Sequence, residues 1–380
     1  MALTKDFGFG PDEALVRDGA RKFLRDTFPI DRLRRLVAAD HHEAYETSPQ
    51  PAPWDRELWQ QLVELGWPGL AVPEAAGGVG MKTIALATLV EEVGRVALPS
   101  PLVATINATA VLKAAGATAW LRRIADGTPA TLAVTDPEGS WRPADSGVTA
   151  IVAGGGATLR GSAAFVQDAR KADVLVVSAR TGDGLGLYAV PTDAPGVRIE
   201  PDRIVDLTRD QATVVFDGVR VDRDGVVAAP PSGLRALEAA VPTLLTIVAA
   251  DLCGAAEWQL QTTTEYAKIR TQFERPIGFF QAVKHPIVNM MLAVDRARSL
   301  VYAAACAIDF EPEDALRLAR MAKAAASDAA AFCSNRSVQL HGGIGFTWES
   351  DVHLYFKRQT HNQMLYGDGA YQRARLAEAF

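Results

Sequence analysis

The chain has 380 residues, and at about 150 residues per domain this length predicts two or three domains. Its residues are 48% hydrophobic and 22% charged, which is ordinary globular usage and excludes disordered, collagen-like and disulfide-scaffold proteins. The 39 basic and 45 acidic residues give a formal charge of -6, and the basic residues are scattered along the chain. We therefore expect neither a nucleic-acid-binding surface nor a surface for anionic membranes.

Cysteine usage and hydropathy indicate a cytoplasmic protein. Three cysteines stand far apart in alanine-rich sequence: Cys253, Cys306 and Cys333. We expect them to be reduced residues of the core. The first residues become charged and amphipathic at once, so no signal peptide is expected. The longest apolar stretch, 237–256, is interrupted by Glu238 and Asp251, which predicts a buried core helix rather than a membrane span.

The hydrophobic periodicity changes twice along the chain. Apolar residues recur at helical spacing up to about Gly127, which predicts an N-terminal helical domain over residues 1–127. Short β-branched runs separated by Gly, Asp and Pro follow, and they predict a middle antiparallel β domain over residues 128–229. Such runs include 130–135, 174–178, 197–199 and 213–216.

Helical spacing returns after residue 229 and lasts almost to the end of the chain. It predicts a C-terminal helical bundle over residues 230–380, with long helices at 237–271, 281–309 and 312–341 and a short helical tail. The fold class is therefore α+β, with a β portion between two helical portions. Alternating βα units are absent, as are the G-x-G-x-x-G and P-loop motifs, which argues against a Rossmann or P-loop nucleotide site.

Two segments carry candidate binding residues. In 266–285 a long helix is predicted to end near Arg270, beside a Pro-Gly turn, where a planar guanidinium suits a pyrophosphate. The alternative is a surface arginine in an ordinary salt bridge. In 339–349 consecutive glycines let a ligand approach the backbone and let free N–H groups point at phosphate. The alternative is a glycine turn that ends a helix.

Taken together, these two segments resemble the acyl-CoA dehydrogenase family. The resemblance rests on R-x-Q-F-x-x-P-I from Arg270 and on Q-x-x-G-G-x-G from Gln339. It extends over essentially the whole chain through 65–80, 91–95, 134–137 and 216–219. It implies the fold of that family, which is an N-terminal helical domain, a middle β domain and a C-terminal four-helix bundle.

The resemblance also implies FAD, bound between the β domain and the C-terminal helices, with its adenine half reaching a neighbouring subunit of a tetramer. The residues expected at the pyrophosphate and adenine end are Arg270, Phe273, Gln281, Gln339, Gly342 and Gly343. The residues expected at the isoalloxazine ring are Val134, Thr135, Phe165, Val166 and Gln167. Gln167 departs from the family, which usually has Thr or Ser there. Trp141 falls where the family has a Ser that meets substrate, and its indole would alter or close the acyl channel.

The catalytic base is where this sequence departs most from the family. The family removes the α-proton of an acyl-CoA thioester with a carboxylate, which here would need a dry pocket that raises its pKa. Gly367 occupies the usual Glu position and Leu244 the alternative one. Asp368 is the carboxylate beside the usual position, and it is either a shifted base or a turn residue that stabilises its own backbone. Glu238 and Asp251 lie nearly two helical turns from Leu244, too far to reach the same carbon.

Three functions remain open at this point. The first is an FAD-dependent acyl-CoA dehydrogenase that uses Asp368 as its base. The second is a base-lacking subunit of a heterotetramer, which serves a homologous catalytic subunit of the kind that acts on bulky steroid side-chain thioesters. The third is a flavin oxidase or monooxygenase on the same fold. The resemblance further implies an acyl-CoA thioester as substrate, a homo-oligomer or heterotetramer, and electron-transfer flavoprotein as electron acceptor. No metal site is expected, because His353 and His361 have no partner at metal-ligand spacing.

Overall fold

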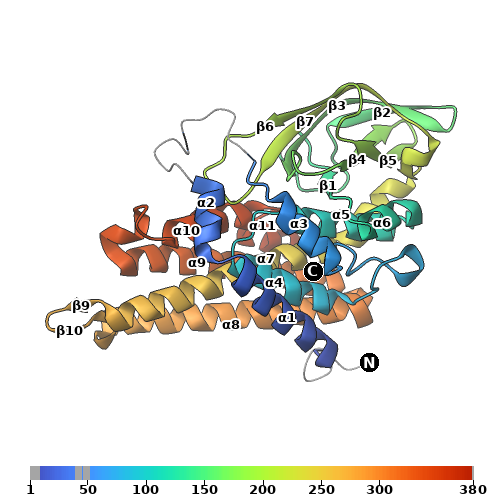
Figure 1. Ribbon diagram of the computed structural model, residues 1–380. Helices are drawn as coiled ribbons and strands as arrows, with labels where there is room; N and C mark the ends of the chain where they lie inside the picture. Colours follow the sequence, from blue (N-terminus) through green and yellow to red (C-terminus); the bar gives the residue numbers. More distant parts are fainter. Residues whose placement is uncertain (1–8, 39–44, 46–51, 379–380) are drawn as a thin grey trace.

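The computed structural model describes residues 9–38, 45 and 52–378, and it shows a β-sheet packed over one face of a helical body (Figure 1). The described N-terminal portion forms α1 (Pro11–Thr27), α2 (Ile30–Ala38), α3 (Arg56–Glu64), α4 (Thr83–Arg95), α5 (Leu102–Ala114) and α6 (Thr118–Ala125). The C-terminal portion forms α7 (Ser232–Ile269), α8 (Gln281–Phe310), α9 (Pro312–His341), α10 (Val352–Met364) and α11 (Gly369–Ala377). The helical, β, helical order of the predicted fold class is confirmed.

The middle portion forms one mixed sheet. Its strands are β1 (Ala130–Ala133), β2 (Val148–Ala153), β3 (Gly156–Gln167), β4 (Val174–Thr181), β5 (Gly184–Pro191), β6 (Val197–Pro201), β7 (Gln211–Val221) and β8 (Val226–Ala228). The strand order is β6-β7-β3-β2-β4-β5-β8, and β1 pairs with β4. The predicted antiparallel β domain is confirmed, and within it β1 and β2 both run parallel to β4. The chain reaches β4 only after the long β2–β3 hairpin, so a parallel crossover becomes possible.

The predicted helices agree closely with the observed ones, and the strands agree less well. The helix predicted over 237–271 is α7, which begins at Ser232 and ends at Ile269, and α9 has its predicted bounds. The runs named from the sequence lie in β1, β4, β6 and β7, and the structure adds β2, β3, β5 and β8. Between α7 and α8 the predicted turn is a short hairpin of β9 (Thr271–Gln272) and β10 (Arg275–Pro276), which projects from one end of the helical body (Figure 1).

One apolar core joins the two helical portions. Its buried side chains come from α1, α3, α4 and α5 and also from α7, α8, α9 and α10. The domain boundaries at residues 127 and 229 therefore follow a change of secondary structure and not a break in the core, and they stay a prediction. A second core lies between α5, α6, α7 and the sheet. A third core is formed by side chains of the sheet strands and their connections.

Helices α4 and α7 touch backbone to backbone where they cross. A Cβ atom at Gly254 would lie 1.8 Å from the carbonyl oxygen of Glu91, and a Cβ at Gly94 would lie 2.2 Å from the carbonyl oxygen of Asp251. These separations are far below van der Waals contact, so only glycine fits at both positions. The pair of glycines sets the distance between the two helical portions.

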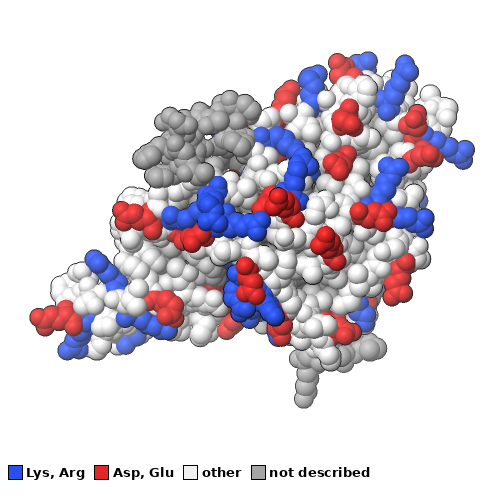
Figure 2. Space-filling view, viewed as in Figure 1, with Lys and Arg blue, Asp and Glu red and all other residues white. Residues whose placement is uncertain are grey.

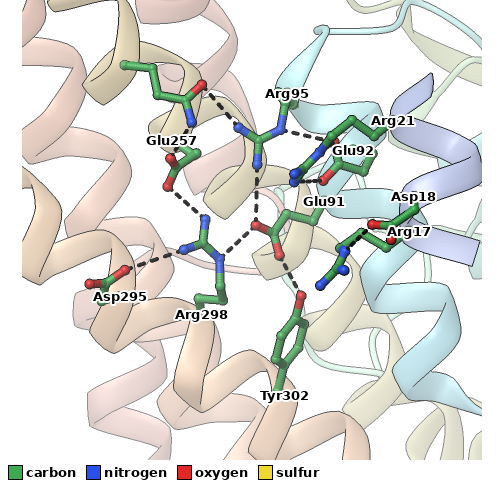
Figure 3. Close-up of polar contacts among 11 residues, drawn as sticks. Arg17, Asp18, Arg21, Glu91, Glu92, Arg95, Glu257, Asp295, Arg298 and Tyr302 are labelled. Atoms are coloured by element: carbon green, nitrogen blue, oxygen red, sulfur yellow. Dashed lines mark hydrogen bonds and ion pairs between the residues drawn. The ribbon is translucent and has the colours of Figure 1, made fainter. Parts of the chain in front are cut away.

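A buried ionic network surrounds this crossing (Figure 3). The guanidinium of Arg298 on α8 donates to Glu91 of α4 at 2.8 Å and to Glu257 of α7 at 2.8 Å. The hydroxyl of Tyr302 also donates to Glu91, at 3.0 Å. Arg95 pairs with Glu91 and with its neighbour on α4, Glu92. Three helices are therefore connected through hydrogen-bonded charges, which is the condition under which buried charges are tolerated.

The surface carries mixed charges, and the long apolar helix is buried, as the sequence predicts. Lys and Arg side chains alternate with Asp and Glu over the face seen in Figure 2, with no extended region of one sign. The most apolar window of α7 has the length and hydropathy of a membrane span, but 78% of it is buried inside the protein. Helix α7 is thus a core helix. All three cysteines are buried, and no disulfide links any of them.

We predict that Gly254→Ala lowers the free energy of unfolding by about 1–3 kcal/mol or more, because the added methyl group has only backbone atoms to displace. Gly19 on α1 provides the control, since a Cβ there would meet nothing within 4 Å. Gly19→Ala should raise stability by about 0.5–1 kcal/mol through helix propensity alone. Urea denaturation of both variants measures this, and equal effects would contradict the proposed role of the crossing.

Candidate functional site

An inner pocket lies between the sheet, α5, α7 and the loop after α10. Among its lining residues are five of those predicted from the sequence: Val134, Thr135, Trp141, Phe165 and Gln167. Val103, Ala104 and Asn107 of α5, Arg209, Val248, Leu365 and Tyr366 also line it. The cavity holds about 30 Å³, which is room for one or two water molecules. The residues expected around a flavin ring are thus assembled, but their side chains fill most of the space between them.

Three aromatic rings form one wall of the inner pocket. A bulge between Ala163 and Val166 gives Phe165 a φ of 54° and turns its ring toward the pocket. The Trp141 ring lies 6.0 Å from that of Phe165 and 5.3 Å from that of Tyr366, measured between centroids. Val166, predicted beside the flavin, packs instead into the core of the sheet. The bulge therefore places the side chain of Phe165 at the pocket and that of Val166 in the core of the sheet.

Gln167 is held firmly in the inner pocket. Its Nε2 donates to Oε1 of Gln211 at 2.8 Å and to the carbonyl oxygen of Phe165 at 3.1 Å. Its Oε1 lies 3.1 Å from Nε2 of His361, so that ring nitrogen carries the proton. Burial lowers the pKa of His361 to about 4. The amide that replaces the usual Thr or Ser of the family is thus fixed between the sheet and α10.

A second buried ionic network lies against the inner pocket. Asp251 of α7 accepts from Nη2 of Arg209 at 2.6 Å, from Nη2 of Arg358 at 2.8 Å and from Nδ2 of Asn362 at 2.9 Å. Burial alone would raise the pKa of Asp251, but Arg358 and Arg209 hold the pKa below its usual value. Asp251 is therefore a poor base. Sequence reasoning missed Arg209, because its partner Asp251 is 42 residues away and no local pattern connects them.

No carboxylate stands at the expected catalytic position. Gly367 has a φ of +89°, and a Cβ atom there would lie 2.2 Å from Cδ1 of Tyr371. The ring of Tyr371 thus occupies the space that a glutamate side chain would enter. Asp368 is the N-cap of α11, and its carboxylate accepts a hydrogen bond from the backbone N–H of Tyr371 at 2.8 Å. Leu244, at the alternative position of the base, is a buried apolar residue.

A buried lysine fixes the loop around Gly367. Nζ of Lys323 on α9 donates to the carbonyl oxygens of Gln363 and Gly367, both at 2.8 Å, and to Oγ of Ser327 at 2.9 Å. Burial lowers the pKa of Lys323 to about 7, although the negative charge of Asp368 acts to raise it. Because all three bonds hold backbone or a neighbouring hydroxyl in place, this amine positions the loop.

An outer pocket lies on the other side of Trp141 and Tyr366, which line both cavities. It holds about 360 Å³ between the N-terminal part of α7, α9 and α11. Leu244, Leu245 and Leu316 contribute apolar surface to it, and Arg320 and Arg375 contribute charge. Trp141, predicted in the substrate channel, therefore stands in the wall that separates the outer pocket from the inner one.

The remaining predicted residues lie at the far end of α7 and α9. The aromatic rings of Tyr266 and His341 stack at 4.3 Å and bring the ends of these two helices together. Six predicted binding residues are exposed in this region: Arg270, Phe273, Gln281, Gln339, Gly342 and Gly343. A Cβ at Gly342 or Gly343 would meet nothing within 4 Å, and the Arg270 guanidinium forms no ion pair with any described residue. This region, which we call the distal end, is open on the surface of the chain.

Comparisons with known proteins identify the family. Residues 10–128 match the acyl-CoA dehydrogenase N-terminal domain and residues 233–380 match its C-terminal domain. The acyl-CoA dehydrogenase IpdE2 of Mycolicibacterium smegmatis is 31% identical over 86% of this chain and 89% of its own length, and IpdE2 of Mycobacterium tuberculosis is 32% identical over 80% of each chain. The chain belongs to the acyl-CoA dehydrogenase family.

Solved structures agree with this assignment. A variant of the Tcur3481-Tcur3483 steroid acyl-CoA dehydrogenase is similar at a TM-score of 0.83 and 30% identity, covering 97% of this chain and 98% of the other. A chain of the ChsE4-ChsE5 complex of Mycobacterium tuberculosis has the same fold at a TM-score of 0.85 and 24% identity, over 98% of both chains.

The acyl-CoA dehydrogenases are FAD enzymes, and the two halves of the expected FAD site fit that cofactor differently. The distal end is open, and its exposed arginine and glycines suit a pyrophosphate. The inner pocket, as its side chains are packed here, is too small for a flavin ring. No group of three or more His, Cys, Asp or Glu side chains in the described part of the chain could hold a metal ion.

We predict that the stability of the protein falls as the pH is lowered from about 6.5 to about 4, because unfolded His361 takes up a proton near 6.5 and folded His361 only near 4. In that window the unfolded state binds more protons, so acid favours unfolding. His353, whose pKa burial also lowers to about 4, acts in the same direction.

Urea denaturation at about pH 7 and about pH 5 tests this linkage. His361→Gln should lose less stability between the two values than the wild type. The exposed His285 on α8 is the control, and His285→Gln should keep the wild-type difference. An unchanged difference in His361→Gln would contradict the assignment.

Proposed function

We propose that this chain is the base-lacking subunit of a two-component, FAD-dependent acyl-CoA dehydrogenase. The observation that carries the proposal is the position of Tyr371, whose ring fills the space beside Gly367 where a catalytic glutamate would stand. Loss of the carboxylate alone could be repaired by a single substitution. Here the neighbouring side chain has taken its place, which indicates that the position no longer serves proton abstraction.

The inner pocket supports the same function. An acyl group must lie between a flavin ring and the base, and about 30 Å³ is too little for either the ring or the acyl group. Phe165, Trp141 and Tyr366 close this space on the side of the outer pocket. The Tcur3481-Tcur3483 steroid acyl-CoA dehydrogenase, to which this chain is similar, is named for two components. This similarity supports a two-component enzyme that acts on bulky thioesters.

The distal end is the part of this chain that would contribute to the cofactor site. Arg270, whose exposed guanidinium has no ion-pair partner among the described residues, would bind the pyrophosphate of an FAD whose ring is held by the partner subunit. Gln281 and the Gly342–Gly343 backbone would contact the same half. FAD supplies the hydride acceptor of the family reaction. The substrate would be an acyl-CoA thioester and the electron acceptor electron-transfer flavoprotein, and we place the complex in the cytoplasm.

The second candidate is a self-sufficient dehydrogenase with Asp368 as its base. Asp368 is the carboxylate closest in sequence to the usual position, but its Oδ1 accepts a hydrogen bond from the backbone N–H of Tyr371. It does not line the inner or the outer pocket. No observation favours a flavin oxidase or monooxygenase.

We expect the isolated chain not to reduce flavin with any acyl-CoA, and activity to appear when a homologous subunit with Glu at the position of Gly367 is co-expressed. Stopped-flow absorbance in the flavin band measures both.

In the complex, Asp368→Asn should leave turnover unchanged, because Asn also caps a helix. A base would instead show a loss of about 10²- to 10⁴-fold on this substitution. Rapid flavin bleaching by the isolated chain would refute the proposal.

We expect Arg270→Ala to weaken flavin retention by the complex by about 10- to 100-fold, since a charge-assisted hydrogen bond to phosphate contributes about 1.5–3 kcal/mol. The control is Arg275→Ala on the adjacent hairpin, because the Arg275 guanidinium stacks over the ring of Phe279 at 4.4 Å. The flavin-to-protein ratio after dialysis measures the difference. Equal retention by the two variants would show that Arg270 does not bind the pyrophosphate.

A further inference from the structure

Another pocket lies at the surface of the helical body, and its lining has none of the roles described above. It holds about 310 Å³ between α1, the start of α2, α4, α7 and α10, and we call it the α1 pocket. This volume is within the range of small-molecule sites. No residue expected at the flavin, the substrate or the base is among the described residues that line it. The α1 pocket is therefore separate from the inner and outer pockets.

An aromatic pair and apolar side chains form much of the α1 pocket. The rings of Trp258 on α7 and Tyr355 on α10 stack at 3.7 Å with an interplanar angle of 5°. Tyr355 is buried, and its hydroxyl donates to the carbonyl oxygen of Arg95 at 2.7 Å. Trp258 is half-buried, and the buried Leu24 and Phe28 of α1 lie in the same lining. The pocket thus holds a fixed indole against which a planar apolar ring can pack.

Arginines supply most of the charge of the α1 pocket. Arg21 and Arg25 are exposed and lie one turn apart on α1, while Arg95 of α4 is half-buried. The acidic residue of the described lining is Glu92, which is buried and accepts from Arg21 at 2.7 Å and from Arg95 at 3.0 Å (Figure 3). The lining therefore carries three positive charges and one negative charge.

These arginines still have donors to spare. Carboxylates outside the lining also act on them, namely Asp18, Asp26, Glu91 and Glu257. Arg21 uses Nε and Nη2 for Glu92, and Arg25 uses Nε for Asp26. Nη1 of Arg21 and both terminal nitrogens of Arg25 form no hydrogen bond with a described residue. Because residues at i and i+4 share one face of a helix, the two guanidinium groups lie on the same side of α1.

We propose that the α1 pocket binds a planar aromatic carboxylate, with its rings against Trp258 and its carboxylate on Arg21 and Arg25. Terminal guanidinium nitrogens match a carboxylate, because the two oxygens of that group accept charge-assisted hydrogen bonds. The bound molecule would connect α1 to α7 and α10, so its binding stabilises the folded chain. The site goes beyond the proposed subunit function and does not depend on it, because it needs neither flavin nor a partner subunit.

Isothermal titration calorimetry of the purified chain tests the site with three probes. Naphthoate carries both the rings and a carboxylate, naphthylmethanol carries the rings alone, and acetate carries the carboxylate alone. The variants are Arg25→Glu and Trp258→Leu. Arg17→Glu is the matched control, since Arg17 pairs with Asp18 as Arg25 pairs with Asp26, on the same helix but outside the pocket lining. Thermal melting verifies that each variant is folded.

We expect naphthoate to bind more tightly than either of the other probes and to raise the melting temperature of the wild-type chain. Arg25→Glu should weaken naphthoate binding by about 10-fold, because it sets a like charge against the carboxylate, and should leave naphthylmethanol binding unchanged. Trp258→Leu should weaken the binding of both aromatic probes by about 2- to 10-fold. Arg17→Glu should change neither.

Three results would overturn the proposal. If naphthoate does not bind the wild-type chain, the pocket is not a site for this class of molecule. Equal affinity for naphthoate and naphthylmethanol would mean that the arginines recognise no carboxylate. An equal loss of naphthoate binding in Arg17→Glu and Arg25→Glu would show that the effect comes from the overall charge of α1 and not from this pocket.

Discussion

The close crossing of α4 and α7 is the contact on which the rest of the molecule depends. Gly94 and Gly254 let the two backbones approach to a distance that no side chain allows. The N-terminal and C-terminal helical portions can therefore share one core, although more than a hundred residues of chain separate them. The ionic network of Glu91, Arg298 and Glu257 lies directly beside the crossing and adds directional bonds to this contact.

The crossing also determines where the inner pocket lies. Asp251, one turn before Gly254 on α7, contacts α4 through its carbonyl group and holds Arg209, Arg358 and Asn362 with its carboxylate. Its backbone thus belongs to the helix crossing, while its side chain connects α7 to the loop before β7 and to α10. The wall of the pocket cannot shift without disturbing this network, because every buried charge in it needs its partners.

The loop around Gly367 is held by bonds that do not involve a side chain at position 367. Lys323 holds the backbone of Gln363 and Gly367, and Asp368 caps α11. These bonds stabilise the fold whether or not a carboxylate stands at position 367. The ring of Tyr371 packs directly beside Gly367, so the loop is closely packed at this position.

The sequence alone determined the order of elements, the approximate bounds of the three long C-terminal helices, the family resemblance and the absence of a carboxylate at the usual positions. Periodicity and motif spacing are local properties of the chain, so they can be read without the fold. It also indicated which residues surround the inner pocket, apart from Val166, which a one-residue alternation in β3 turns into the core of the sheet. Only the tertiary structure decided how those residues are packed. The positions of Tyr371 against Gly367, of Arg209 against Asp251 and of Arg320 in the outer pocket depend on side chains from different elements meeting in space. Such contacts are set by the packing of helices and strands, which no spacing within the sequence encodes.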